Sequence, residues 1–362
     1  MAELLKNVYT AESLQEAAEI IQAVYPAFPV EEFLAKTMDE TWEELGIKGR
    51  VRKITLSLGE CLPADYPEAV AILDEIAPKL SGGLFGLFVP DFVEVYGQGE
   101  ADWDLSIQAM EKYTQYWSSE MVVRPFIINH EERMMAQMNA WARHENEHVR
   151  RLASEGCRPL LPWSQPLTKY KQDPTPVLEL LEQLKADPSA YVRKSVANNL
   201  NDISKNQPEL IVQLAKDWYG ENEQTNWIVK HGCRTLLKKG NREVLEIFGY
   251  GDSLAVEVKD FTLETAKVAI GEAVTFAFTL IAKKDTKVRL EYGIDYMKAN
   301  GKPSRKIFQL SAIAMQEGEE KFYQRSHSFK NVSVRTHYPG THSVTLIVNG
   351  TERGTWDFEV YE

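Results

Sequence analysis

Residues 190–201, "AYVRKSVANNLN", decide the fold, because two other stretches of the chain repeat their pattern. These are "EHVRRLASEGCR" at 147–158 and "NWIVKHGCRTLL" at 226–237, and in all three a large residue and apolar residues precede basic and then small residues. Their starting points at 147, 190 and 226 give intervals of 43 and 36 residues. Such a period is typical of stacked helix pairs in HEAT or armadillo solenoids.

When the three stretches are placed in register, Arg151, Lys194 and Lys230 correspond to one another. One helical turn further on, Glu155 corresponds to Asn198 and to Arg234. A solenoid stacks equivalent positions of successive repeats along one surface. The sequence therefore predicts a column of basic side chains along the concave face of the repeats.

The remainder of the first 247 residues also predicts helices. Apolar residues recur at helical spacing in "SLQEAAEIIQAVY", "PEAVAILDEIA", "LSIQAMEKYTQYW" and "TPVLELLEQLKA". Capping and breaking residues stand at "TAES" (10–13), "KQDPTP" (171–176) and "ADPS" (186–189). We expect residues 1–247 to form one all-α, HEAT-like helical solenoid.

The pattern changes to period two after the stretch "IFGYGDS" (247–253), which we expect to be a linker. Alternation of apolar and polar residues predicts seven strands, in "SLAVEVKDFTL", "EAVTFAFTLIA", "KVRLEYGIDYM", "RKIFQLSAIAM", "KFYQRSHSF", "HSVTLIVNG" and "TWDFEVYE". Seven short strands within about 110 residues are typical of an all-β, immunoglobulin-like sandwich. The second predicted domain is 254–362.

Charge is distributed unevenly along the chain. The 53 acidic residues outnumber the 41 lysines and arginines, but residues 143–239 hold 15 basic and 12 acidic residues, a local net charge of +3. A basic middle in an acidic chain is compatible with an anionic polymer as partner.

The three cysteines fit no zinc or disulfide framework, and the sequence has no signal peptide and no apolar run of about 20 residues. We expect a monomeric cytoplasmic protein that does not contact membranes.

Two glutamates lie among basic and aromatic residues in the helical half. Arg151, Glu155 and Arg158 are spaced to share one helix face, with Trp163 beyond the helix end. A second group consists of Tyr116, Trp117, Glu120 and Arg124, in which Tyr116, Glu120 and Arg124 follow one another at intervals of four and are predicted to share one helix face. Each glutamate is either half of a solvated surface ion pair or a carboxylate held within a phosphate-binding surface.

Four stretches of the helical half resemble the AlkC branch of the AlkD-type DNA glycosylases. They are "FLAKTMDETWEELGIKGRVRKITLSL" (33–58), "YWSSEMVVRPFI" (116–127), "HVRRLASEGCRPLLPW" (148–163) and "NWIVKHGCRTLLKKG" (226–240). The resemblance implies removal of alkylated bases from double-stranded DNA in base excision repair, without flipping the base and without a metal or cofactor. It also implies that Glu120 is the active-site carboxylate, that Glu155 and Trp163 line the lesion site, and that Arg151 and Arg158 contact DNA beside it. Some members carry a C-terminal immunoglobulin-like domain.

The chemistry of such a reaction suits these residue types. A base methylated at a ring nitrogen, such as 3-methyladenine, is already cationic, so its departure as a neutral base needs no strong general acid. A fixed carboxylate stabilises the oxocarbenium-like sugar and positions water. Aromatic faces attract the cationic nucleotide. We therefore expect Glu120 and Glu155 to be catalytic and Tyr116, Trp117 and Trp163 to be lesion-site aromatics.

The remaining candidates are basic residues for phosphate binding. The predicted DNA-binding set is Arg124, Arg151, Arg158, Arg193, Lys194, Lys230, Arg234 and Lys238. The sequence departs from the AlkD branch, which uses an aspartate with two tryptophans, and this leaves 3-methylcytosine as a further candidate lesion beside 3-methyladenine. The alternative hypothesis is a non-catalytic HEAT-repeat module that binds nucleic acid structure or a protein partner.

Overall fold

The computed structural model describes residues 5–80, 82–332 and 335–362. The chain divides into two compact units. The first extends to Gln207 and also contains Asn222–Gly232, whereas the second consists of Pro208–Glu221 and Cys233–Glu362. A helical region is therefore followed by a β-rich region, as the periodicity predicts.

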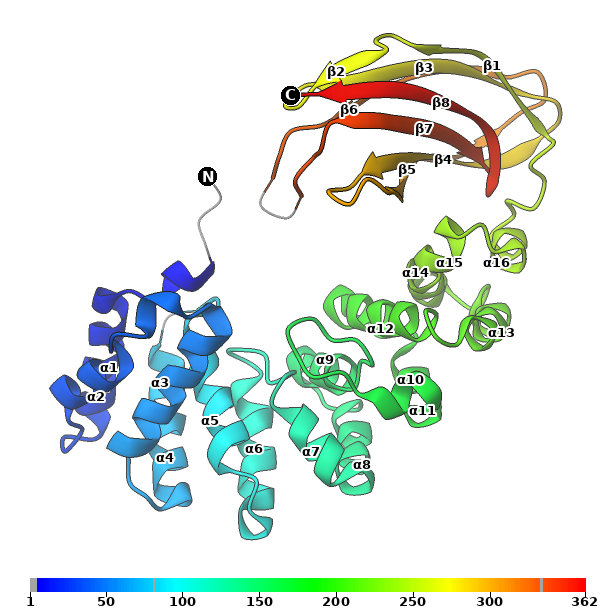
Figure 1. Ribbon diagram of the computed structural model, residues 1–362. Coiled ribbons are helices and arrows are strands. Elements are labelled where there is room, and N and C mark those ends of the chain that lie inside the picture. Colours follow the sequence, from blue (N-terminus) through cyan, green and yellow to red (C-terminus); the bar gives the residue numbers. More distant parts are fainter. Residues whose placement is uncertain (1–4, 81, 333–334) are drawn as a thin grey trace. The chain divides into compact units, whose positions relative to one another are not determined.

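The first unit is built of helices that follow one another in a row (Figure 1). They are α1 (Ala11–Val24), α2 (Val30–Thr37), α3 (Ile47–Cys61), α4 (Tyr66–Ile76), α5 (Phe88–Tyr96), α6 (Trp103–Tyr113), α7 (Val123–Asn129), α8 (Glu131–Trp141), α9 (Glu147–Gly156), α10 (Thr168–Gln172), α11 (Thr175–Leu184), α12 (Ala190–Ile203) and α14 (Glu223–Gly232).

Local sequence explains where several of these helices begin. The Thr10 side chain caps α1 in a reciprocal capping box with Ser13, and Asp65, Asn146 and Ser189 cap α4, α9 and α12. These side chains accept hydrogen bonds from amides that have no partner within the helix. The starts of α1 and α12 confirm the predicted boundaries at 10–13 and 186–189.

The three similar stretches lie side by side, because α9 packs on α12 and α12 packs on α14. The apolar residues Val149, Leu152 and Ala153 of α9 are fully buried. The third stretch differs from its prediction, because α14 ends at Gly232 and a new helix, α15 (Arg234–Lys238), begins after Cys233. Arg234 therefore does not lie one turn beyond Lys230 on the same helix.

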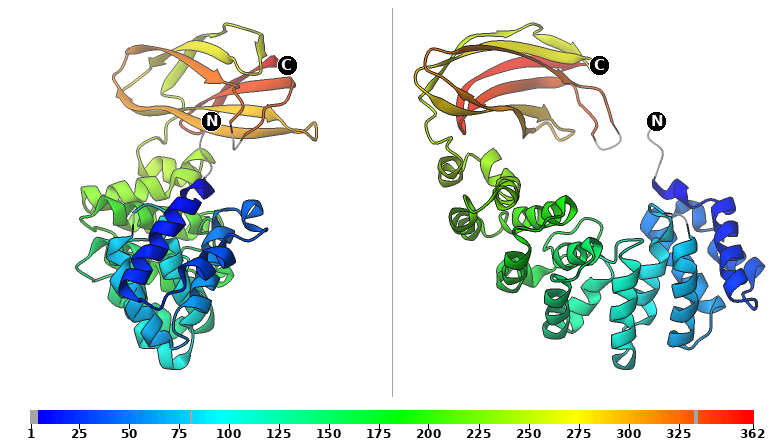
Figure 2. Two further views of the ribbon diagram at one scale, coloured as in Figure 1. Left: turned by 90° about the vertical axis from the view of Figure 1, so that its left-hand side faces the viewer. Right: turned by 180° about the vertical axis from the view of Figure 1, so that it is seen from behind.

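The second unit combines α13 (Pro208–Trp218), α15 and α16 (Arg242–Ile247) with a sandwich of two sheets (Figure 2). One sheet has the order β1-β3-β6 and the other has the order β2-β8-β7-β4-β5. The strands are β1 (Val256–Leu263), β2 (Lys267–Ala269), β3 (Ala273–Ala282), β4 (Thr286–Met297), β5 (Pro303–Met315), β6 (Glu320–Ser328), β7 (Gly340–Val348) and β8 (Thr351–Tyr361).

All seven predicted strands are present, and β2 is an addition that the sequence analysis missed. It spans only three residues and pairs in parallel with β8 at the sheet edge. A segment this short contains too little alternation to be recognised. The sandwich core is formed by inward residues of both sheets, including Phe276, Phe278, Tyr292 and Leu346.

The linker predicted at 247–253 lies between the last helix and the first strand, since α16 ends at Ile247 and β1 begins at Val256. Within the second unit, the ring of Tyr219, after α13, lies 4.9 Å from that of Phe248. Lys216 of α13 also pairs with Glu243 of α16 at 2.5 Å. The division into domains at 247 and 254 stays a prediction.

The three cysteines, Cys61, Cys157 and Cys233, are buried and unpaired. Burial raises the pKa of the Cys157 and Cys233 thiols to about 12, and it also raises the pKa of Cys61. Among the described residues, no helix is long and apolar enough to cross a bilayer.

Candidate active site

Arg151 joins the two candidate carboxylates. Its guanidinium forms an ion pair with Glu120 through Nη1 and another with Glu155 through Nη2, the latter at 3.3 Å. The three side chains are poorly exposed, with exposed fractions of 22% for Glu120, 13% for Arg151 and 7% for Glu155. The two glutamates, 35 positions apart in sequence, thus belong to one site of the first unit.

Glu120 lies in the turn between α6 and α7. The prediction that Tyr116, Glu120 and Arg124 share one helix face was wrong, because α6 ends at Tyr113 and α7 begins only at Val123. Glu120 Oε2 accepts a hydrogen bond of 2.8 Å from Ser118 Oγ and also contacts Arg151. No described residue hydrogen-bonds to or pairs with the other oxygen, Oε1. Glu120 therefore has one engaged carboxylate oxygen and one without a partner among the described residues.

Glu155 is engaged on both oxygens within the protein. Its Oε1 accepts from Arg158 Nη1 at 2.6 Å and lies near Arg151, and its Oε2 accepts from Ser195 Oγ at 2.6 Å. Ser195 belongs to α12, so this bond crosses between two of the similar helices. Two arginines and Ser195 therefore hold this buried carboxylate in one position.

Arg158 pairs with side chains inside the protein, whereas a residue that contacts DNA is expected to be exposed. It is buried, and it donates from Nε to Asp202 of α12 at 2.8 Å in addition to its bond with Glu155. Burial alone would lower the pKa of Arg158, but Glu155 and Asp202 raise it above its ordinary value. We infer that Arg158 fixes Glu155 and does not bind phosphate.

Arg124 is also buried and bonded inside the protein, with an exposed fraction of 1%. Its guanidinium donates to the main-chain carbonyls of Gly156, Arg158 and Gln165 at 3.0, 2.8 and 2.7 Å. Burial lowers the pKa of Arg124 to about 10, so it remains charged at neutral pH. Arg124 thus fixes the segment that carries Trp163, and we do not include it among the phosphate contacts.

The three predicted aromatic residues differ in exposure. Tyr116 and Trp163 are exposed at 44% and 53%, whereas Trp117 is 3% exposed and packs against Gly86, where a Cβ atom would lie 2.1 Å from the indole. Trp163 has a positive φ of 63°, which is uncommon for a bulky residue. Only Tyr116 and Trp163 therefore have faces that a nucleotide could reach, and Trp117 belongs to the core.

The other predicted phosphate contacts are distributed over both units. In the first unit, Lys194 and Lys230 are exposed, and Arg193 donates to the carbonyls of Asp187 and Pro188 at 2.8 and 2.7 Å. Arg234 and Lys238 lie on α15 and belong to the second unit. The exposed lysines are the strongest remaining candidates.

Tyr191 is a residue that the sequence analysis missed. The Arg151 guanidinium carbon lies 5.0 Å from the centre of its exposed ring. Partial burial raises the pKa of the Tyr191 phenol, the positive charge of Arg151 acts to lower it, and the negative charges of Glu120 and Glu155 act to raise it. The repeats offered a signal for this residue, because Tyr191 is the second residue of its stretch and corresponds to His148 and Trp227.

Ser118, Ser195 and Asp202 were also missed, because their roles depend on contacts with Arg151, Glu155 and Arg158, which lie far from them in sequence. The described residues contain no cluster of three or more histidine, cysteine or acidic side chains that could hold a metal ion. The site consists of carboxylates, arginines and aromatic rings.

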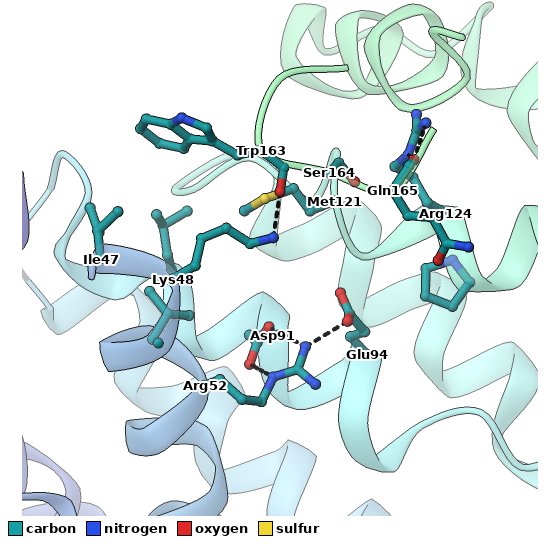
Figure 3. Close-up of a pocket in the computed structure, with 14 residues that line it drawn as sticks. Ile47, Lys48, Arg52, Asp91, Glu94, Met121, Arg124, Trp163, Ser164 and Gln165 are labelled. Carbon is teal, nitrogen blue, oxygen red and sulfur yellow. Dashed lines mark hydrogen bonds and ion pairs between the residues drawn. The ribbon is translucent and has the colours of Figure 1, made fainter. Parts of the chain in front are cut away.

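A cavity of about 340 Å³ lies beside this site in the first unit (Figure 3). Its wall includes α3 residues, Met121 next to Glu120, and the segment Trp163–Gln165. Across its lower part, Arg52 pairs with Asp91 at 2.9 Å and with Glu94 at 2.5 Å. Burial raises the pKa of the Glu94 carboxyl.

Comparisons with known proteins cover nearly the whole chain. The family model described as "DNA alkylation repair enzyme" matches residues 95–244, and that described as "Uncharacterised protein YhaZ, C-terminal Ig-like domain" matches residues 257–362. YhaZ of Bacillus subtilis (strain 168) is 46% identical over 356 residues, which are 98% of this chain and 99% of YhaZ.

A solved structure agrees with these matches. Pseudomonas fluorescens alkylpurine DNA glycosylase AlkC, bound to DNA containing an abasic site analog, is 38% identical with a TM-score of 0.96. The similarity covers 99% of this chain and 100% of that chain.

Proposed function

Since the chain belongs to the AlkC-type family of DNA alkylation repair glycosylases, we propose that it releases cationic alkylated bases, chiefly 3-methyladenine, from double-stranded DNA. The observation that carries the proposal is the geometry of Glu120, whose Oε2 is held by Arg151 and Ser118 while Oε1 has no partner among the described residues. A module that only binds DNA has no need of a carboxylate with an unengaged oxygen among arginines.

The proposed reaction depends on the charge of the departing base. The glycosidic bond breaks as a cationic base leaves neutral, and positive charge develops on the sugar. An anionic Glu120 stabilises that charge and directs water towards the sugar carbon. Arg151 and Ser118 hold the carboxylate in place in advance, so it does not reorganise during the reaction.

Glu155 has a supporting part in this proposal. Both of its oxygens are engaged by Arg151, Arg158 and Ser195, so it contributes a fixed negative charge and orients Arg151. The exposed faces of Tyr116, Tyr191 and Trp163 are available to a cationic nucleotide, with an attraction of about 1 kcal/mol or more per ring when water is excluded.

The proposal is tested by release of 3-methyladenine from methylated DNA under single-turnover conditions. Glu120→Gln keeps the size of the side chain and removes its charge, so we expect a fall in rate of about 100-fold or more, with DNA affinity changed by only a few-fold. Glu131→Gln, which removes a carboxylate that pairs with Lys169, is the matched control and should retain full activity.

This assay tests the enzymatic function and the assignment of Glu120 separately. A wild-type chain that binds DNA and releases no base would contradict the enzymatic function and favour the non-catalytic module. Full activity of Glu120→Gln would leave the reaction in place and contradict the assignment of its carboxylate. A panel of defined lesions including 3-methylcytosine sets the substrate range.

We propose that the enzyme is monofunctional. A lyase reaction needs an amine that forms a Schiff base with the sugar. The cations that contact Glu120 and Glu155 among the described residues are arginines, which remain protonated. Borohydride treatment during turnover should therefore trap no covalent complex with DNA, and a trapped complex would contradict this part of the proposal.

A further inference from the structure

The backbone of Trp163 is in the left-handed region, with a φ of 63°. Residues other than glycine rarely adopt this conformation, and a bulky side chain makes it costly in free energy. Such a conformation persists only where surrounding contacts hold it. The contacts around residue 163 therefore determine where the exposed indole lies.

Arg124 holds the flanks of this segment through the carbonyls of Gly156, Arg158 and Gln165. The carbonyl of Trp163 itself is held from another part of the chain. Lys48, in the first turn of α3, donates a hydrogen bond from Nζ to Trp163 O across 115 positions of sequence. Figure 3 shows this carbonyl turned towards Lys48 while the indole points away from the cavity.

The cavity explains why the segment needs such a contact. Its volume of about 340 Å³ lies between α3 and Trp163–Gln165, so these two walls are not packed directly on each other there. The Lys48 side chain spans this space to reach the carbonyl (Figure 3). Without that bond, the segment could relax towards the cavity and Trp163 could return to a negative φ.

Charged side chains line the cavity beside Lys48. Asp91 and Glu94 present two negative charges, and Arg52, which pairs with both, supplies one positive charge. The positive charge of Lys48 acts on Glu94 in the direction that lowers the pKa of its carboxyl. Lys48 adds a second positive charge beside the two carboxylates. Because Arg52 already pairs with Asp91 and Glu94, the Lys48 ammonium group bonds to the Trp163 carbonyl instead.

We propose that Lys48 is a positioning residue of the lesion site, which acts by holding Trp163 in its left-handed conformation. This inference rests on the proposed function, because it assigns Trp163 to the lesion site. Lys48 itself need not touch the DNA. Its effect on excision passes through the position of the indole.

A double-mutant cycle with Lys48→Met and Trp163→Ala tests the proposal by single-turnover release of 3-methyladenine. We expect Lys48→Met to slow release about tenfold, since misplacement of a site residue is costly, with affinity for undamaged DNA changed less than twofold. Lys48→Arg should recover most of the rate. In the Trp163→Ala background, Lys48→Met should have no further effect.

Lys53→Met is the matched control, because Lys53 lies on the same helix and pairs with Asp39. It should release base at the wild-type rate. The proposal would be overturned if Lys48→Met released base at the wild-type rate. It would also be overturned if the fall in rate of the double variant equalled the product of the two single-variant falls.

Hydrogen exchange of residues 157–167 provides a readout that does not depend on catalysis. Lys48→Met should exchange faster in this segment than wild type and Lys53→Met, whereas unchanged exchange would overturn the proposal. If the wild-type chain releases no base, the proposed function fails, while the exchange experiment still decides whether Lys48 holds the segment.

Discussion

At the scale of single residues, Glu120 and Glu155 are both acidic and both contact Arg151, yet their surroundings predict different consequences of mutation. Glu155 is buried between two arginines and Ser195. Glu155→Gln removes one charge from this buried group, and we expect a loss of about 3 kcal/mol in the free energy of unfolding of the first unit, measured by urea denaturation. Glu120→Gln, at the more exposed of the two carboxylates, should cost less, about 1 kcal/mol.

Equal losses of stability for the two variants would contradict this distinction. The expected pattern is that Glu120→Gln loses activity with little loss of stability, and that Glu155→Gln loses both. The comparison separates a residue exposed to substrate from one that supports the site.

The residue types of the site were predictable from sequence, but the accessibility of several residues was not. The family resemblance favoured Arg158 as a DNA contact, and Arg124 was included as a basic residue close to Glu120 in sequence. Their burial depends on Gln165 and Asp202, which approach from other parts of the chain. A periodic pattern gives the face of a helix and does not show what covers that face.

At the scale of elements, the strands and most helices were predicted correctly because their periodicity is strong. The errors fall where the local sequence signal is weak. The turn that carries Glu120 follows a helix whose apolar pattern continues to Trp117 in sequence, although α6 ends at Tyr113. Trp117 lies in the core beside Gly86 without continuing the helix. Tertiary packing here overrides the periodic pattern.

Strand β6 carries a buried histidine that should make stability depend on pH. His327 lies between the hydroxyl groups of Tyr292 and Tyr296, at 2.9 and 2.6 Å. Burial, and then the positive charges of Arg335 and other nearby basic groups, lowers the pKa of His327 to about 4. The unfolded chain, in which histidine has a pKa near 6.5, therefore binds this proton more readily than the folded sandwich does.

The contribution of His327 to the free energy of unfolding is fully present above pH 6.5, where the imidazole is neutral in both states. It is lost as the pH falls from 6.5 to 4, because only the unfolded chain binds the proton over this range. It amounts to at most about 3 kcal/mol. We expect His327→Gln to flatten the decline in unfolding free energy over this range, measured by denaturation of the second unit at several pH values. Parallel pH profiles for wild type and variant would contradict the assignment.

At the scale of the whole molecule, phosphate binding by the first unit should depend on its exposed lysines. Lys194 is exposed on α12, the helix that supplies Tyr191 and Ser195 to the site. Lys194→Gln should weaken DNA binding and lower the slope of log affinity against log salt concentration by about one. Lys36→Gln is the charge-matched control, because Lys36 already pairs with Glu32 and Glu60. An unchanged slope for Lys194→Gln would place DNA on another surface.

The division of the chain into units leads to a prediction about fragments. Residues 233–362 keep α15 and α16 with the sandwich, whereas 254–362 contain the predicted β domain alone. Leu245 of α16 approaches Gly350 so closely that a Cβ there would lie 2.5 Å from Leu245 Cδ1. We expect the longer fragment to unfold at a higher urea concentration. Equal midpoints would support a domain boundary between 247 and 254.

The burial of the three cysteines has a consequence for a protein that repairs alkylation damage. Methylating agents react with thiolates faster than with most other protein groups, because the thiolate is the nucleophilic form of cysteine. With pKa values of about 12, Cys157 and Cys233 remain protonated at neutral pH, and Cys61 is buried as well. Burial thus keeps Cys157 and Cys233 in the less nucleophilic thiol form. We expect these three cysteines to react slowly with methylating agents as long as the protein is folded.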